Sequence, residues 1–237
     1  GWRSVFWCAA GSCALAALVL ARVMPLRPAR AALGYRDLLA SIAALVGRHP
    51  TLRASMGLGA MAFAIFAALW TVLAFQLHTL GYGADVVGYL GALSLGSVLG
   101  AAAFGALADR RGTFFTGTVA WLLLLLSCGT YAVVGHTLWG LVVASALLPL
   151  GVSLTQISNQ TRIFALDDTA RSRINTAYMF TIFSGGALGA LGATIAWQHA
   201  GWSGVCALLL GFVAAMAPLL LWYARFERRS ARSHTAS

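Results

Sequence analysis

Long apolar runs separated by short charged gaps make up almost the whole chain. A helix needs about 20 apolar residues to cross a hydrocarbon core of roughly 30 Å. Three uncharged intervals, 4–21, 54–84 and 86–108, have the length of one crossing, and two others, 112–161 and 174–224, have the length of two. The pattern therefore predicts an all-α, polytopic membrane protein with about seven transmembrane helices.

Each of the two longest intervals has a polar, glycine-containing break near its middle. The breaks read VVGHTLWG around His136 and WQHAGW around His199. Because glycine and polar residues between two apolar segments favour a turn, each interval is predicted to be a helical hairpin with a histidine at its tip.

The gap that follows the first span is long enough to be a linker between domains. It opens with PLRP, which disfavours a continuing helix, and then places apolar residues at helical spacing over 35–50. Such a segment favours an amphipathic helix on the membrane surface. The predicted organisation is a single span over 1–24, a cytoplasmic linker over 25–53, a six-helix bundle over 54–225 and a cytoplasmic tail over 226–237.

Composition supports the membrane class. The chain is 60% hydrophobic and only 9% charged, whereas about a quarter of the residues in a soluble domain are charged. Its net charge of +10 does not indicate nucleic acid as a partner, because the charges lie only in the gaps between apolar runs. All basic residues are arginine, which excludes a retinal protein, since its Schiff base needs a lysine. The four cysteines show no metal-binding spacing, so no metal and no cofactor is expected.

The arginines predict the orientation. Cytoplasmic loops of membrane proteins are enriched in Lys and Arg. If the chain starts outside, fifteen of the sixteen arginines face the cytoplasm and only Arg3 faces outwards. We therefore expect a multi-pass protein of the bacterial cytoplasmic (inner) membrane, with the lipid bilayer around it and its C-terminus in the cytoplasm.

Glycine pairs at GxxxG spacing occur in two of the last six predicted spans. They are Gly96 with Gly100 and Gly185 with Gly189, and small residues at this spacing let two helices approach closely in lipid. Each pair lies in the middle span of a set of three, which suggests the internal repeat of a transporter. Ordinary helix packing is the alternative explanation.

The gap between 86–108 and the next span reads GALADRRG and resembles the loop signature of the major facilitator superfamily, G-x-L-a-D-r-x-G-r-[RK]. The stretches LWTVLAFQLHTLGYGADVVG and SNQTRIFALDDTARSRINTAYM are also similar to the C-terminal half of drug- and metabolite-efflux members. The resemblance covers essentially the whole chain. Thr113 departs from the loop signature, because the family usually has a basic residue at this position. The matching positions are Gly105, Leu107, Asp109, Arg110 and Gly112.

This resemblance implies that 1–24 is helix 6 of a twelve-helix transporter and that the later spans are helices 7 to 12. The first five helices would then precede Gly1, where the chain starts within an apolar run. The implied function is secondary active transport by alternating access, as a proton-coupled antiporter for the efflux of a small organic molecule. Its N-terminal half is then an expected partner.

The loop signature carries a candidate gate. Asp109 lies at the expected inner membrane edge, where an unpaired carboxylate is costly. In one arrangement it pairs loosely in a solvated turn with Arg110 or Arg111. In the other it forms a latch with Arg162 and with a helix of the N-terminal half, closed when the transporter faces outwards. Arg162 alternatively extends its side chain to the cytoplasm.

Aromatic and amide side chains recur on single faces of three predicted spans and are candidates for the wall of a substrate cavity. Amides within a span are costly unless they face protein or water, and transporters of this kind bind substrate between their two halves. Interhelical hydrogen bonds and plain packing are the alternatives. The cavity candidates are Phe66, Trp70, Ser153, Gln156, Asn159, Gln160, Asn175 and Tyr178, with Phe63 extending the aromatic stripe.

Two other functional classes make different demands on the sequence. An intramembrane enzyme needs a carboxylate pair, a metal cluster or an activated nucleophile at membrane depth. Every acid of this chain lies in a gap, so an enzyme is not expected, and a proton-coupling carboxylate would lie in the preceding helices. A truncated or non-transporting membrane scaffold protein is the remaining alternative.

Overall fold

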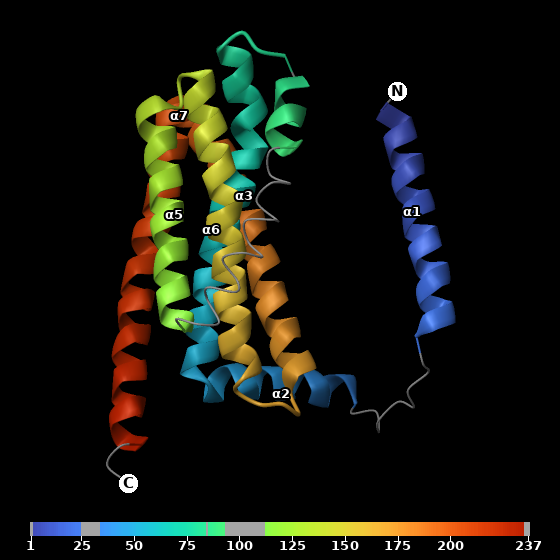
Figure 1. The fold of residues 1–237 in the computed structure, drawn as a ribbon, viewed down its shortest axis with the longest axis vertical. Coiled ribbons are helices and arrows are strands. Elements are labelled where there is room, and N and C mark those ends of the chain that lie inside the picture. The colour runs from blue at the N-terminus through green and yellow to red at the C-terminus, as the bar shows by residue number, and fades with distance from the viewer. Residues whose placement is uncertain (1, 25–33, 84, 93–111, 235–237) are drawn as a thin grey trace. The chain divides into compact units, whose positions relative to one another are not determined.

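The computed structural model describes residues 2–24, 34–83, 85–92 and 112–234 (Figure 1). All elements in these ranges are helical, which confirms the all-α class. Five helices are long and apolar enough to cross a membrane, and the longest contains two crossings. The predicted span 86–108 lies mostly outside the described residues. The labelled helices are α1 (Trp2–Val23), α2 (Tyr35–Arg48), α3 (Pro50–Thr79), α5 (Thr113–Val134), α6 (Leu138–Phe164) and α7 (Arg171–His234).

The chain divides into two compact units, Gly1–Leu38 and Leu39–Ser237. In the first unit, α1 has the length of one crossing and exposes large apolar side chains such as Phe6, Trp7 and Leu15. A helix that is apolar on all sides is stable only where lipid or other helices surround it. This is the expected property of a transmembrane helix.

In the second unit, α3, α5, α6 and α7 form a bundle around one apolar core. The strongest packing is between α3 and α7 and between α5 and α6, while α3 also contacts α6 and α5 contacts α7. Leucine and isoleucine side chains from all four helices are fully buried, among them Ile65, Leu69, Leu124, Leu148 and Leu209.

Both predicted hairpins are present. α5 ends at Val134 and α6 begins at Leu138, where the side chain of the N-cap Thr137 accepts a hydrogen bond from the Gly140 N–H at 3.1 Å. α7 reverses at Gly201, whose φ of 57° and ψ of −145° are not helical. A positive φ is readily adopted only by glycine. Gly201 therefore divides α7 into a first helix (171–200) and a second helix (202–234), which run in opposite directions (Figure 1).

Hydrogen bonds join the helices where the two hairpins turn, which we call the tip end of the bundle. The Trp202 indole N–H donates to the Tyr131 carbonyl at 3.1 Å, so one hairpin tip is bound to the other. The Gln76 amide donates to the Gly135 carbonyl at 3.0 Å, so the end of α3 is joined to the turn between α5 and α6. These polar contacts fix the helix ends relative to one another.

The opposite end, where α2 and the α6–α7 loop lie, is the linker end (Figure 1). Here Leu45 and Val46 of α2 pack against a second apolar cluster that includes Leu52 and Ile174. Arg53 donates to the Val46 and Gly47 carbonyls at 3.0 and 2.6 Å and so caps the end of α2. The amphipathic helix expected on the membrane surface therefore places part of its apolar face on the bundle.

Candidate functional site

The first helix of α7 and α3 meet through small residues. A Cβ atom added to Gly185 would lie 2.6 Å from the Ala60 carbonyl oxygen, and one added to Gly189 would lie 2.6 Å from the Ala64 Cα. The two glycines and the two alanines are each one helical turn apart, so the backbones touch over a full turn. The other pair, Gly96 and Gly100, lies outside the described residues.

This close packing shapes a small cavity between α3, α6 and α7, at the side of the contact nearer to the linker end. Most of its lining is apolar, but Thr155 and Gln156 of α6 and Tyr178 of α7 bring polar side chains to it. Gln156 lies eight residues before the end of α6, or about 12 Å along a helix axis. The cavity is lined by Gly59, Ala62, Phe63, Val152, Thr155, Gln156, Tyr178 and Ile182.

The polar groups around the cavity are incompletely hydrogen-bonded. Tyr178 is fully buried, and a Cβ atom on Gly59 would lie 2.9 Å from its hydroxyl, so this glycine makes room for it. The Asn159 amide donates to the Ser55 carbonyl at 3.1 Å. The Asn159 side chain also lies near the Tyr178 hydroxyl, but the two groups do not have hydrogen-bond geometry. The Tyr178 and Ser55 hydroxyls therefore have no hydrogen-bond partner among the described residues, whereas buried polar groups normally have one.

An aromatic ladder on α3 leads away from the cavity. The Phe63 and Phe66 rings stack with centroids 5.8 Å apart, and the Phe66 and Trp70 rings follow at 6.0 Å. Phe183 of α7 meets Phe63 edge-on at 5.5 Å. Aromatic pairs in these geometries are stabilised beyond the area that they bury.

The structure brings together some of the predicted cavity residues and separates others. Gln156 and Tyr178 line the cavity, Phe66 and Trp70 continue the ladder, and Asn159 makes the interhelical hydrogen bond that was the alternative to a substrate contact. Ser153, Gln160 and Asn175 are half-buried and are not part of its lining.

Sequence reasoning missed Ser55, Gly59 and Thr155. Ser55 and Gly59 are four residues apart in an apolar span, which is the small-residue spacing that marks close helix contacts. That spacing was available in the sequence.

Arg162 joins three helices near the linker end. Its guanidinium donates to the Thr113 carbonyl at 2.6 Å and lies over the Tyr223 ring, with Cζ 3.9 Å from the ring centroid. Its side chain contacts α5 through Gly117, where an added Cβ atom would lie 2.9 Å from Nη2. Arg162 is only 5% exposed. The side chain is therefore held within the bundle and does not extend into solvent.

The residues of the loop signature lie at the edge of what the structure describes. Gly105, Leu107, Asp109, Arg110 and Arg111 are outside the described residues. Gly112 is the N-cap of α5, and its φ of 84° is in the region that favours glycine. The next residue, Thr113, offers its carbonyl to Arg162 and also to the Ser158 hydroxyl, at 2.7 Å. α6 thus holds the residue that directly follows Gly112.

The α6–α7 loop has its own hydrogen-bonded turn. The Asp167 carboxylate accepts from the Thr169 hydroxyl and N–H at 2.6 and 2.8 Å and from the Ala170 N–H at 3.2 Å. These hydrogen bonds, led by that of the Thr169 hydroxyl, lower the pKa of Asp167 from its ordinary value of 3.8. Asp168 pairs with Arg171 at 2.7 Å in an exposed ion pair. Both loop carboxylates therefore bind partners in the loop or at the start of α7.

Comparison with known proteins agrees with this architecture. The chain is 39% identical to the "Uncharacterized transporter YgaY" of Escherichia coli O157:H7, over 98% of this chain and 59% of that protein. It is 35% identical to the "Probable transporter SCO4007" of Streptomyces coelicolor, over 90% of this chain and 51% of that protein. The chain thus spans between half and six-tenths of the length of these relatives. The model of the Major Facilitator Superfamily matches residues 1–190, and the chain belongs to that family.

Proposed function

We propose that the full-length protein is a secondary active transporter that exports a small organic molecule across the bacterial cytoplasmic membrane. The observation that carries the proposal is the small cavity between α3, α6 and α7, where the buried Tyr178 hydroxyl and the Gln156 amide meet a mostly apolar lining. Incompletely satisfied polar groups at membrane depth are characteristic of substrate pathways. In this proposal, the N-terminal half of the longer protein supplies the opposite wall.

The exposed face of the first helix of α7 is a candidate contact for that half. Phe180 and Phe183 are 75% and 63% exposed, and Phe183 also touches Phe63 at the cavity. A partner helix on this face would close the aromatic side of the cavity. Alternating access then amounts to rocking one half against the other around the bound substrate.

The cavity lining suggests the chemistry of the substrate. No charged side chain is among the described residues that line it, so an uncharged molecule with a few polar groups would match this wall. The cavity has a volume of only about 10 Å³, about the space of one water molecule, so in this proposal it widens when the substrate enters. Phe63 offers an aromatic surface, and Gln156 and Tyr178 offer hydrogen bonds. Such a mixture of apolar walls and a few oriented polar groups is usual in small-molecule sites.

We further propose that a proton gradient drives the export and that the titrating group belongs to the N-terminal half. All six acids of this chain lie in the gaps between apolar runs. Arg48, Arg53, Arg171 and Arg225 all lie towards the linker end of the bundle. Under the rule that positive residues stay inside, this distribution supports a cytoplasmic linker end and a cytoplasmic C-terminus.

The proposal is tested with the full-length protein in inverted membrane vesicles and a panel of uncharged aromatic compounds. We expect at least one compound to accumulate when the vesicle interior is acidified and to be released by a protonophore. Tyr178→Phe and Gln156→Leu should each raise KM by about fivefold, because each removes a hydrogen bond worth about 1 kcal/mol. The matched control is Thr130→Val, since the exposed Thr130 hydroxyl bonds only within its own helix, to Leu126. If no compound moves with the gradient, the scaffold alternative is correct.

A separate experiment tests the latch. In our proposal Asp109 engages Arg162 and the N-terminal half when the cytoplasmic side is closed. Asp109→Asn should slow transport while leaving the amount of protein in the membrane unchanged, and Asp168→Asn serves as a control, because Asp168 pairs with Arg171 in an exposed loop. A transport rate equal to that of the parent protein would exclude the latch and favour a solvated turn.

A further inference from the structure

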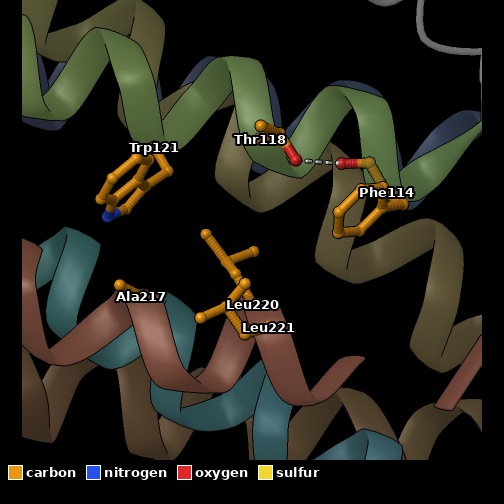
Figure 2. A pocket seen from close by; sticks show the side chains of 6 residues that line it. All are labelled: Phe114, Thr118, Trp121, Ala217, Leu220 and Leu221. Carbon is orange, nitrogen blue, oxygen red and sulfur yellow. Dashed lines mark hydrogen bonds between the residues drawn. The ribbon is translucent and has the colours of Figure 1, made fainter. Parts of the chain in front are cut away.

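A second hollow lies on the other side of the bundle, between α5 and the second helix of α7. Figure 2 shows Phe114, Thr118 and Trp121 of α5 on one side of it and Ala217, Leu220 and Leu221 of α7 on the other. None of these residues belongs to the polar cavity described above. We call this hollow the α5–α7 groove.

The α5–α7 groove presents only apolar surface, because its polar atoms are bound elsewhere. The Thr118 hydroxyl donates to the Phe114 carbonyl at 2.9 Å, the hydrogen bond drawn in Figure 2. The Trp121 indole N–H donates to the Val213 carbonyl of α7, also at 2.9 Å. A ligand of this groove therefore gains no hydrogen bond from its walls and must be a hydrocarbon along its buried part.

Size narrows the choice of ligand. The groove has a volume of about 190 Å³, whereas sites for drug-sized molecules occupy about 300–1,000 Å³. A narrow apolar chain fits better than a compact ring system. In a membrane, such a chain is available at high concentration as the acyl tail of a phospholipid.

Charge at one mouth of the groove indicates the kind of phospholipid. The groove opens near the start of α5 and close to the charged end of α7, where exposed Arg225 follows Leu221 by one helical turn. The first turn of α5 contains no acidic residue and has no side-chain cap, so its partial positive charge also favours an anion. In the sequence, Arg228 and Arg232 follow Leu221 by seven and eleven positions, the spacing of one helical face, and Glu227 is the only acid after Arg225.

We propose that the α5–α7 groove binds one acyl chain of an anionic phospholipid whose phosphate lies beside Arg225. A run of arginines directly beyond a transmembrane helix attracts anionic headgroups by about 1 kcal/mol for each charge near the surface. The apolar walls hold the tail, and the arginines select the headgroup. The lipid then joins the second helix of α7 to α5 beside the contact that Arg162 makes with Thr113 and Tyr223.

Trp121 provides a direct probe, because bromine atoms on an acyl chain quench indole fluorescence at contact. The full-length protein is reconstituted in phosphatidylcholine vesicles with increasing fractions of brominated phosphatidylglycerol, or of brominated phosphatidylcholine in a parallel series. The signal of Trp121 is the difference between the parent protein and Trp121→Phe. We expect this signal to be quenched at about fivefold lower fractions of the anionic lipid than of the zwitterionic one.

Two variants test the acyl-chain contact and the headgroup contact separately. Ala217→Phe fills the groove and should remove quenching by both lipids, while Arg225→Gln should reduce the preference for the anionic lipid and leave the quenching. Arg171→Gln removes the same charge from an exposed position at the start of α7 and should change neither result. Circular dichroism and monodisperse gel filtration confirm that each variant is folded.

Equal quenching by the two lipids would overturn the headgroup assignment and therefore the proposal. Quenching that persists in Ala217→Phe would show that the lipid lies elsewhere. If neither lipid quenches Trp121, another protein segment or a second copy of the protein covers the groove, and the proposal fails.

Discussion

Replacing Gly189 with alanine tests the closest contact in the bundle. The added methyl group would lie 2.6 Å from the Ala64 Cα and even closer to the Ala64 carbonyl oxygen. Ordinary carbon–carbon contacts lie at about 3.5–4.0 Å, so the two backbones must separate by about 1 Å. Because the opposing atoms belong to a helix backbone and not to a flexible side chain, no rotamer change can relieve the overlap.

The expected cost follows from this overlap. Overpacking a close-packed core destabilises by about 1–3 kcal/mol, and separating α3 from α7 also loosens neighbouring contacts along the same interface. For a domain of this size, each kcal/mol lowers the melting temperature by about 2–4 °C. We therefore expect Gly189→Ala to melt about 2–12 °C below the parent protein. Gly185→Ala should behave in the same way, since its methyl group would meet the Ala60 backbone.

Scanning fluorimetry of the purified, detergent-solubilised protein measures this shift. Gly211→Ala is the matched control, because a Cβ atom there has nothing within 4 Å although Gly211 lies in the same α7 element. Alanine is the better helix former by about 1 kcal/mol, so Gly211→Ala should leave the melting temperature unchanged or raise it. Equal melting of Gly189→Ala and Gly211→Ala would show that α3 and α7 do not approach as closely as described.

Three further results are expected. Arg162→Met should lower the melting temperature by an amount that corresponds to about 2 kcal/mol, since it removes a charged hydrogen bond to Thr113 and the stacking on Tyr223. Arg162→Lys should melt between the parent protein and Arg162→Met, because lysine keeps the charge but cannot stack in the same way. An unchanged melting temperature in both variants would contradict the role of Arg162 in joining α5, α6 and α7. The lowered pKa of Asp167 means that its turn is fully stabilised above pH 3.8 and loses this contribution as the pH falls through the lowered pKa. Hydrogen exchange of the amides that Asp167 binds should thus report loss of protection in acid, and Asp167→Asn should remove this pH dependence. Single cysteines placed at His136 and His199 should react with a membrane-impermeant maleimide in intact cells, whereas shielded tips would refute the orientation.

The hairpins illustrate how much the sequence alone could predict. Apolar intervals twice the length of one crossing, each with a glycine and a histidine at its centre, were enough to place the turns that the structure has near Gly135 and Gly201. The physical reason is local, since membrane thickness sets helix length and a polar break cannot lie in the hydrocarbon core. The amphipathic helix over 35–48 follows from periodicity in the same way.

The candidate site was only partly predictable. Gln156 and Tyr178 were identified because polar groups in an apolar span are costly unless they face protein or water. Both line the cavity. Asn159 has the same sequence signal, yet it makes a hydrogen bond to the Ser55 carbonyl on α3. Periodicity shows which face of a helix a residue occupies, but not which helix that face meets.

The sequence by itself determined the class of the protein and the two hairpin turns, and it predicted an orientation from the arginines that stays a prediction. These properties depend on how each segment interacts with lipid and water. Only the tertiary structure decided that Arg162 is buried between Thr113 and Tyr223 and that Gly185 and Gly189 meet Ala60 and Ala64. It also showed that α5 and α7 leave an apolar groove. These features depend on contacts between residues far apart in the chain, and such contacts exist only after the helices have packed.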